Sequence, residues 1–327
     1  MKKFHALFFF CVGVCVALQG AQVTDGAGRV VEFAAAPKRI VSMAPSTTEL
    51  ICAVGAQEEL VGITRHCVYP ESIRDRQVVG SSLDPDYERI VALKPDVVIM
   101  SHLADKRAIG RFERLGIAVM MLNPEGLDSV GADLRLLGKA LGREKQAEAA
   151  AVHLEQSIAA RKAQVARYEQ THKRPRVLFL YGTKWNLSAG KGSFAGDLLN
   201  VAGGQNLADE AKVPWPQLSK EYVLARDPQI ILLVEEGGEG KIFEPQVDNA
   251  QIEQWKKDPV YSRLEAVKKN RVYKLDARLF YYPGPRLVDA LDQLAGIIDA
   301  YFCSLDSGKT SEAATDNPNK SATMPSD

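Results

Sequence analysis

Two segments of the chain share one pattern of apolar and polar positions, 133 residues apart. Residues 88–100 read ERIVALKPDVVIM and residues 221–233 read EYVLARDPQIILL, and the two align without a gap. Each begins with a glutamate, continues as a short helical pattern, breaks at a proline (Pro95 or Pro228) and ends in four consecutive apolar residues. Proline ends a helix because it lacks the amide hydrogen and clashes with the preceding turn. The pattern therefore predicts a helix followed by a buried strand, twice.

Strands without polar alternation are typical of parallel sheets that are covered on both faces. Further apolar runs recur in the same order, because residues 39–43 (RIVSM) open the first half and residues 176–180 (RVLFL) open the second. Later runs at 117–122 and 271–275 resemble additional strands. Strands that alternate with helices imply right-handed crossovers and layered structure. We therefore predict an α/β fold with two related Rossmann-like lobes and parallel sheets.

The two lobes are assigned to residues 38–140 and 174–303, and the segment between them has a different pattern. Residues 143–172 contain no glycine or proline and place apolar side chains at helical spacing. We predict one long helix within 141–173 that joins the lobes, about 45 Å long at about 1.5 Å per residue. Sustained heptads are missing, which argues against a coiled coil. One rigid helix restricts lobe motion, and a ligand cleft is expected between the lobes at the carboxyl ends of the strands.

The first residues have the features of an export signal. Lys2 and Lys3 precede an apolar run at 7–18, and the small residues Gly20 and Ala21 follow. The run is short for a membrane span, and no stop-transfer flank follows it. We assign residues 1–21 to a cleaved signal peptide, which predicts a periplasmic protein; a retained membrane anchor is the alternative.

A lipid anchor is less expected, because neither Cys11 nor Cys15 follows a small residue. Residues 22–37 are assigned to an N-terminal lead. Residues 304–327 are rich in Ser, Thr, Asp, Asn and Lys, and we expect this tail to be disordered because it has little to bury.

Charge and cysteine content exclude several classes of function. Lysine plus arginine and aspartate plus glutamate each total 41, so no net field attracts nucleic acid or anionic lipid. Cys52, Cys67 and Cys303 have no metal-type spacing, and Cys52 either pairs with Cys67 or is buried on an apolar helix face. Glycines at 26–28 and 237–240 lack the spacing of a phosphate-binding loop, and no motif of a hydrolase or metalloprotease is present.

Aromatic side chains gather in the loops expected at the carboxyl ends of strands. They occur near Tyr69, in the loop that begins at Tyr181, around Trp215, and at Tyr281 in the loop 280–286. Exposed aromatic rings are costly unless they meet something flat and apolar, such as a large planar chelate. Trp215, between two prolines, either contacts such a ligand or fastens its own loop to the lobe.

Four segments resemble the helical-backbone solute-binding proteins of iron-chelate and cobalamin ABC importers. These are residues 39–49 (RIVSMAPSTTE), 60–63 (LVGI), 88–96 and 213–226 (VPWPQLSKEYVLAR), and the last is most similar to the cobalamin-binding members. The resemblance extends over about residues 38–300. It implies two α/β lobes joined by one helix, which agrees with the pattern above.

The resemblance also implies roles for particular residues. It places Tyr69 and Trp215 against the ligand, and it makes Glu88 and Glu221 surface carboxylates that dock on arginines of the two permease subunits. One equivalent carboxylate per lobe suits a pseudo-twofold protein that meets a two-subunit channel.

The sequence departs from the cobalamin-binding members at two positions. Residues 80–83 (GSSL) replace a ligand-facing tryptophan, and residues 201–204 (VAGG) replace a stretch with a disulfide cysteine. Haem-binding relatives use the tyrosine of a similar Tyr-Pro loop as iron ligand, which makes Tyr69 and His66 the candidates for a haem iron.

Siderophore-binding relatives hold the chelate with arginines, for which Arg65 and Arg286 are the candidates here. We therefore expect an importer component that binds a corrinoid, with haem or a ferric siderophore as the alternative. It is expected to be a monomer with no cofactor or metal of its own. An enzyme that processes the chelate is the alternative of a different class, but no acid, base and nucleophile constellation supports it.

Overall fold

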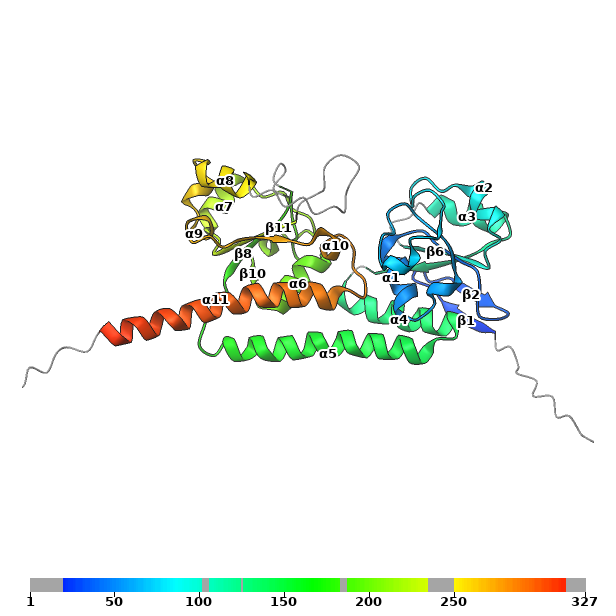
Figure 1. Cartoon of the computed structure of the whole chain (residues 1–327), viewed down its shortest axis with the longest axis horizontal. Helices are drawn as coiled ribbons and strands as arrows, with labels where there is room; N and C mark the ends of the chain where they lie inside the picture. The colour runs from blue at the N-terminus through cyan, green and yellow to red at the C-terminus, as the bar shows by residue number, and fades with distance from the viewer. Residues whose placement is uncertain (1–19, 102–105, 125, 183–186, 235–249, 316–327) are drawn as a thin grey trace, which may run out of the picture.

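The computed structural model describes residues 20–101, 106–124, 126–182, 187–234 and 250–315. It has two α/β lobes side by side above two long helices (Figure 1). The predicted fold class, two lobes with parallel sheets joined by a long helix, is confirmed.

The first lobe is built on a parallel sheet in the order β5-β4-β3-β6-β7. Every residue of β3 and β6 is buried, which explains their lack of polar alternation. The strands are β3 (Ile40–Ser42), β4 (Leu60–Ile63), β5 (Gln77–Val78), β6 (Val97–Ser101) and β7 (Ala118–Leu122). The helices are α1 (Pro45–Ala53), α2 (Tyr87–Ala92), α3 (Lys106–Arg114) and α4 (Leu127–Leu141).

The second lobe has the parallel order β10-β8-β11-β12, with β9 antiparallel to β8. The strands are β8 (Arg176–Tyr181), β9 (Leu187–Ser188), β10 (Gln205–Asn206), β11 (Ile230–Val234) and β12 (Val272–Leu275). The helices are α6 (Phe194–Ala202), α7 (Lys220–Arg226), α8 (Ala250–Lys257), α9 (Glu265–Lys268), α10 (Ala277–Phe280) and α11 (Leu287–Thr315).

The duplication seen in the sequence extends to the topology. In the first lobe the opening strand β3 lies between β4 and the repeated strand β6, and β7 lies beyond β6. In the second lobe the opening strand β8 lies between β10 and the repeated strand β11, and β12 lies beyond β11. The two repeated segments therefore occupy equivalent places in the two sheets.

An arginine at the start of each opening strand makes the same contact in both lobes. Arg39 donates from Nε and Nη2 to the carbonyl of Leu93, at 3.0 and 2.7 Å, just after α2. Arg176 donates from Nε to the carbonyl of Arg226 at 3.0 Å and from Nη2 to that of Asp227 at 2.9 Å, at the end of α7. Cations satisfy the free carbonyls at a helix C-terminus. Each repeated helix is thus tied to the edge of its sheet.

The helix α5 (Glu144–Tyr168) lies inside the segment assigned to the bridge and runs beneath both lobes (Figure 1). Ala147, Ala151 and Leu154 are buried on its side facing α4. Further along, the buried Arg161 donates from Nη1 to Asp299 of α11 at 2.8 Å and from Nε to the carbonyl of Ala202 at 3.1 Å. One end of α5 is therefore fixed to each lobe.

The expectation that the chain is disordered from residue 304 is wrong for residues 304–315. The helix α11 begins with buried residues such as Leu287 and Phe302 and continues to Thr315. No proline occurs in this stretch, and a helix that is already nucleated by packing adds further residues at little cost. The rest of the predicted tail, 316–327, lies outside the described residues.

The N-terminal lead is in fact an antiparallel hairpin of β1 (Ala21–Thr24) and β2 (Val30–Phe33). Val23, Val31 and Phe33 join the core of the first lobe. In the turn, Asp25 Oδ1 accepts hydrogen bonds from the amides of Ala27 and Arg29. Ala21, placed in the signal segment, begins β1, and residues 1–19 lie outside the described residues.

Close packing of α4 on α5 gives a first testable prediction. A Cβ atom at Gly138 would collide with the Cβ of Ala147. We expect Gly138→Ala to lower the free energy of unfolding by about 1–3 kcal/mol, because overpacking outweighs the gain in helix propensity. Chemical denaturation measures this change.

The matched control is Gly296 of α11, where an added Cβ meets no atom within 4 Å. Gly296→Ala should raise the free energy of unfolding by about 0.5–1 kcal/mol. Equal stabilisation by both changes would mean that α4 and α5 are not in close contact at Gly138.

Candidate functional site

A cavity of about 60 Å³ lies where the two lobes face each other. The first lobe contributes residues that follow β3, β4, β5 and β7 and the last residue of β6, and the second contributes the loop after α10. The lining residues are Ala44, Pro45, Ser46, His66, Ser82, Ser101, Pro124, Tyr282 and Pro283. The cavity is therefore at the carboxyl ends of the first lobe's strands, where ligands of α/β folds bind.

A cluster of aromatic rings in the second lobe, here called the aromatic wall, adjoins the cavity, because the Tyr281 ring lies 6.4 Å from the ring of the lining residue Tyr282. The ring of Tyr181, at the end of β8, packs edge-on against Trp215 and Tyr281, with centroids 5.3 and 5.6 Å apart. The Tyr181 hydroxyl donates to the carbonyl of Phe280 at 2.5 Å, which ties β8 to the loop after α10. Tyr181 is buried, whereas Trp215 is 46 % exposed. Tyr181 thus supports the exposed Trp215 ring and the partly buried Tyr281 ring.

The backbone on either side of Trp215 is held by β9 and the residues after it. The amide of Ser188 donates to the carbonyl of Pro216 at 2.8 Å, and the amide of Gly190 donates to that of Pro214 at 2.9 Å. A Cβ at Gly190 would collide with the carbonyl of Val213, so only glycine allows this approach. Backbone hydrogen bonds fasten the loop, which leaves the indole ring available for a ligand.

Tyr69 and Arg286 come together from different lobes. The Tyr69 ring lies 4.3 Å from the Arg286 guanidinium carbon and is 46 % exposed. The guanidinium expected to hold a ligand is already engaged, because its Nε and Nη2 donate to the two carboxylate oxygens of Glu49. Sequence reasoning did not single out Glu49.

His66 lines the cavity between the lobes. Burial, followed by the nearby charge of Arg65, lowers the pKa of His66. Both causes favour the neutral imidazole, the form that can coordinate a metal.

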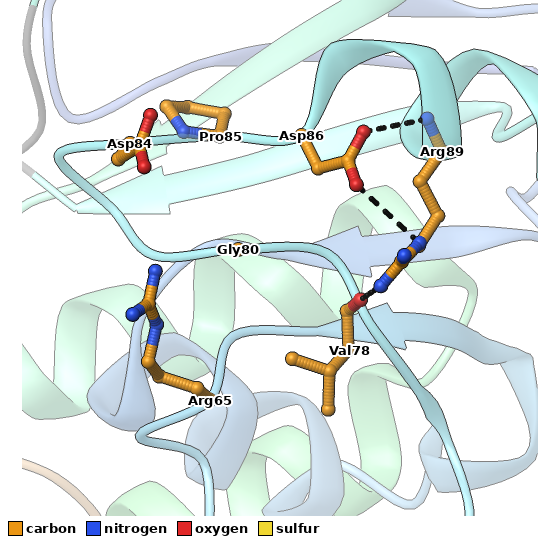
Figure 2. Close-up of a pocket in the computed structure, with 7 residues that line it drawn as sticks. All are labelled: Arg65, Val78, Gly80, Asp84, Pro85, Asp86 and Arg89. Atoms are coloured by element: carbon orange, nitrogen blue, oxygen red, sulfur yellow. Dashed lines mark hydrogen bonds and ion pairs between the residues drawn. The ribbon is translucent and has the colours of Figure 1, made fainter.

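Arg65 faces a different hollow from its neighbour His66. Its guanidinium lines a hollow of about 450 Å³ on the first lobe, beside the N-terminus of α2 (Figure 2). Opposite are Asp84 and Asp86, and Asp86 accepts a hydrogen bond from the Arg89 amide at 3.0 Å. The two hollows share no lining residue. The structure therefore places Arg65 and His66 at different hollows.

Tyr282 is a lining residue that sequence reasoning missed, because the loop 280–286 was represented by Tyr281 alone. Tyr181 was noted only as the start of its loop. Tyr181 is the last residue of β8 and Tyr282 follows the short helix α10, and an aromatic residue at such a position is the signal that would have found them.

Glu88 and Glu221 are exposed in the first turns of α2 and α7. Asp86 and Ser219 cap these helices by accepting from the amides of Arg89 and Tyr222. Hydrogen bonds from its own backbone amide and from the Ser219 hydroxyl lower the pKa of Glu221. Both helices lie on the side of the lobes opposite α5 (Figure 1).

Cys52 and Cys67 are free thiols and do not form the disulfide considered above. Cys67 is buried and its sulfur accepts a hydrogen bond from the Thr48 hydroxyl at 3.1 Å. Burial raises the pKa of Cys52 to about 12. Cys52 was expected either to pair with Cys67 or to be buried on a helix face. In the structure it is unpaired and partly buried.

Two features are absent from the described residues. In that part of the chain, no group of three or more His, Cys, Asp or Glu side chains is arranged to hold a metal ion. None of the helices there has the length and apolar character needed to cross a membrane.

These features define a class: two-lobed solute-binding proteins with a helical backbone, in which the ligand binds between the lobes. The chain belongs to the periplasmic binding protein family, whose model matches residues 40–279.

A vitamin B12-binding protein of Pectobacterium atrosepticum is 31 % identical over 201 residues, 61 % of this chain and 72 % of that protein. A structure of a periplasmic haem-binding protein from Pseudomonas aeruginosa is 28 % identical with a TM-score of 0.68, over 80 % of this chain and 92 % of that one. The vitamin B12-binding protein of Vibrio cholerae, 24 % identical with a TM-score of 0.65 over 81 % of this chain and 97 % of that one, shares the fold. The predicted family is confirmed.

A buried carboxyl near the cavity gives a pH-dependent prediction. Asp133 of α4 accepts from the amide of Asn123, which precedes the lining residue Pro124, and burial raises the Asp133 pKa to about 7. Because the folded state holds this proton more tightly than the unfolded state, stability should fall as the pH rises from about 4 to above 7.

We expect Asp133→Asn to raise the free energy of unfolding at pH 8 by on the order of 1–3 kcal/mol, and to change it much less at pH 4.5. Denaturation at the two pH values measures the difference. The same effect at both would mean that Asp133 does not titrate in this range.

Proposed function

We propose that this chain is the substrate-binding component of an ABC importer, and that it captures a corrinoid in the periplasm and delivers it to the permease. The wall formed by Tyr181, Trp215 and Tyr281 is the observation that carries the proposal. It offers a flat ligand the exposed Trp215 ring, beside the partly buried Tyr281 ring, on a rigid support, which limits the entropy lost on binding. The identity to vitamin B12-binding relatives supports the corrinoid.

Haem is the second candidate, and a ferric siderophore is a third. Tyr69 and His66 present a phenol and an imidazole, the two side chains that bind ferric iron in many haem proteins. A haem-binding structural neighbour at 28 % identity supports this reading. A siderophore is less favoured, because Arg286 is paired with Glu49 and Arg65 lines a different hollow from the cavity between the lobes.

Titration of the purified protein with cyanocobalamin, haemin and a ferric siderophore separates the candidates. Tryptophan quenching and visible absorption report binding, and a dissociation constant at or below about 1 µM is expected for the physiological ligand. If none of the three binds in this range, the proposal fails. Recovery of the ligand unchanged after long incubation is expected for a carrier, and conversion would instead indicate an enzyme.

Trp215 tests the aromatic wall. We expect Trp215→Ala to weaken corrinoid binding by about 10- to 100-fold, the loss typical of an aromatic residue at the centre of a binding site. Val213→Ala is the matched control, because Val213 lies in the same loop and is equally exposed, at 46 %. Similar weakening by both changes would mean that the loop, and not the indole ring, matters.

Tyr69 distinguishes haem from a corrinoid. Tyr69→Phe removes the hydroxyl and keeps the ring that stacks on Arg286. If haem is the ligand, the visible spectrum should lose its phenolate band. Corrinoid affinity should stay within about threefold, because stacking is unchanged.

Glu88 and Glu221 test docking. Reversing both charges, Glu88→Arg with Glu221→Arg, should stop ligand uptake by cells while ligand affinity stays unchanged, because both side chains are remote from the cavity lining. The control, Glu32→Arg with Glu144→Arg, reverses two exposed charges on the α5 side and should leave uptake intact. Loss of ligand binding in the first double variant would place these glutamates in the binding site.

A further inference from the structure

A buried ion pair joins the two lobes at the base of the candidate site. Glu49 is in α1 of the first lobe, and Arg286 directly precedes α11 of the second, 237 residues further along the chain. Arg286 donates from Nε to Oε2 at 2.8 Å and from Nη2 to Oε1 at 2.5 Å. A bidentate contact of this kind fixes the relative orientation of the guanidinium and the carboxylate as well as their distance.

Both side chains of the ion pair are largely shielded from water. The Glu49 and Arg286 side chains are 9 % and 16 % exposed. Burial raises the pKa of Glu49 even though Arg286 opposes the shift. An unpaired carboxylate is costly in such a place, so Glu49 and Arg286 depend on each other.

The guanidinium also connects the pair to the candidate ligand contacts. One face of the Tyr69 ring lies over it, and Nη2 donates to the carbonyl of Arg278 at 3.0 Å. Arg286 closes the loop that carries Tyr281 and Tyr282, and Tyr69 belongs to the first lobe. The Arg286 side chain therefore contacts residues of both lobes.

We propose that Glu49 is a positioning residue: through Arg286 it holds Tyr69 and the loop 281–286 in place and sets the spacing of the two ligand-contacting surfaces before any ligand arrives. The proposal rests on the proposed function, since it assigns Tyr69 and this loop to ligand binding. A site fixed in advance loses less entropy on binding, so breaking the pair should reduce affinity without removing any ligand contact.

The test compares Glu49→Gln with wild type in two measurements. The first is the dissociation constant for cyanocobalamin and for haemin, which should rise by roughly tenfold for the probe that wild type binds. The second is amide hydrogen exchange of residues 281–291 in the ligand-free protein, which should become faster. The Arg161–Asp299 pair offers a matched control, because it is also partly buried and joins α5 to α11 away from the cavity.

Asp299→Asn and Glu49→Gln should both lower the melting temperature. Asp299→Asn should leave the dissociation constant and the amide exchange of residues 281–291 unchanged. Faster exchange with unaltered affinity in Glu49→Gln would overturn the positioning role, and unaltered exchange would overturn the proposal that the pair holds the loop. An equal loss of ligand affinity in Glu49→Gln and Asp299→Asn would mean that Glu49 stabilises the fold in general and does not position the site.

If wild type binds neither probe, the proposed function fails, and the exchange measurement still decides whether Glu49 holds the loop. If Glu49→Gln does not fold, Arg286→Lys replaces it, because lysine keeps the charge and loses the two-pronged geometry. Arg286→Lys is likewise expected to raise the dissociation constant and to speed amide exchange of residues 281–291.

Discussion

The packing of α5 against both lobes is the constraint on which the rest of the structure depends. At its start the helix approaches α4 so closely that Gly138 must lack a side chain, and further along Arg161 ties it to α6 and α11. Helices in such contact do not slide or bend easily, because interiors are close-packed. The two sheets are therefore held at a fixed separation, and their strand ends define one region between them.

That constraint brings together candidate binding groups from distant parts of the sequence. Loops after the strands of the first lobe supply His66 and Tyr69, and the second lobe supplies Trp215, Tyr281 and Tyr282. The rings of the second lobe are supported by Tyr181 and by backbone hydrogen bonds, and Arg286 of the second lobe contacts Glu49 and Tyr69 of the first. Rigid support under exposed rings suits a ligand that is flat, large and rigid itself.

Much of the fold could be predicted because its signals are local. Runs such as 97–100 and 230–233 are apolar throughout because both faces of their strands are buried, and the matching Pro95 and Pro228 mark equivalent helix ends. The hairpin at residues 21–33 was missed because its strands are only four residues long. The length of α11 was missed because its polar second half continues a helix that is nucleated elsewhere.

The site was less predictable than the fold. Tyr69, Trp215 and Tyr281 could be named from aromatic residues in loops and from family resemblance. The partner of Arg286 could not, because Glu49 lies 237 residues away and looks like any polar residue in a helix. Likewise, Arg65 and His66 are neighbours in the chain, yet the backbone turns them towards different hollows.

The central claim is that a flat chelate binds between the lobes against the aromatic wall. A crystal structure of the complex with cyanocobalamin, or with haemin if only haemin binds, tests it most directly. The ligand plane is expected to contact Trp215 and Tyr281 on one side and to reach the Tyr69 loop on the other. A ligand found in the hollow beside Arg65, or on the surface of one lobe only, would contradict it.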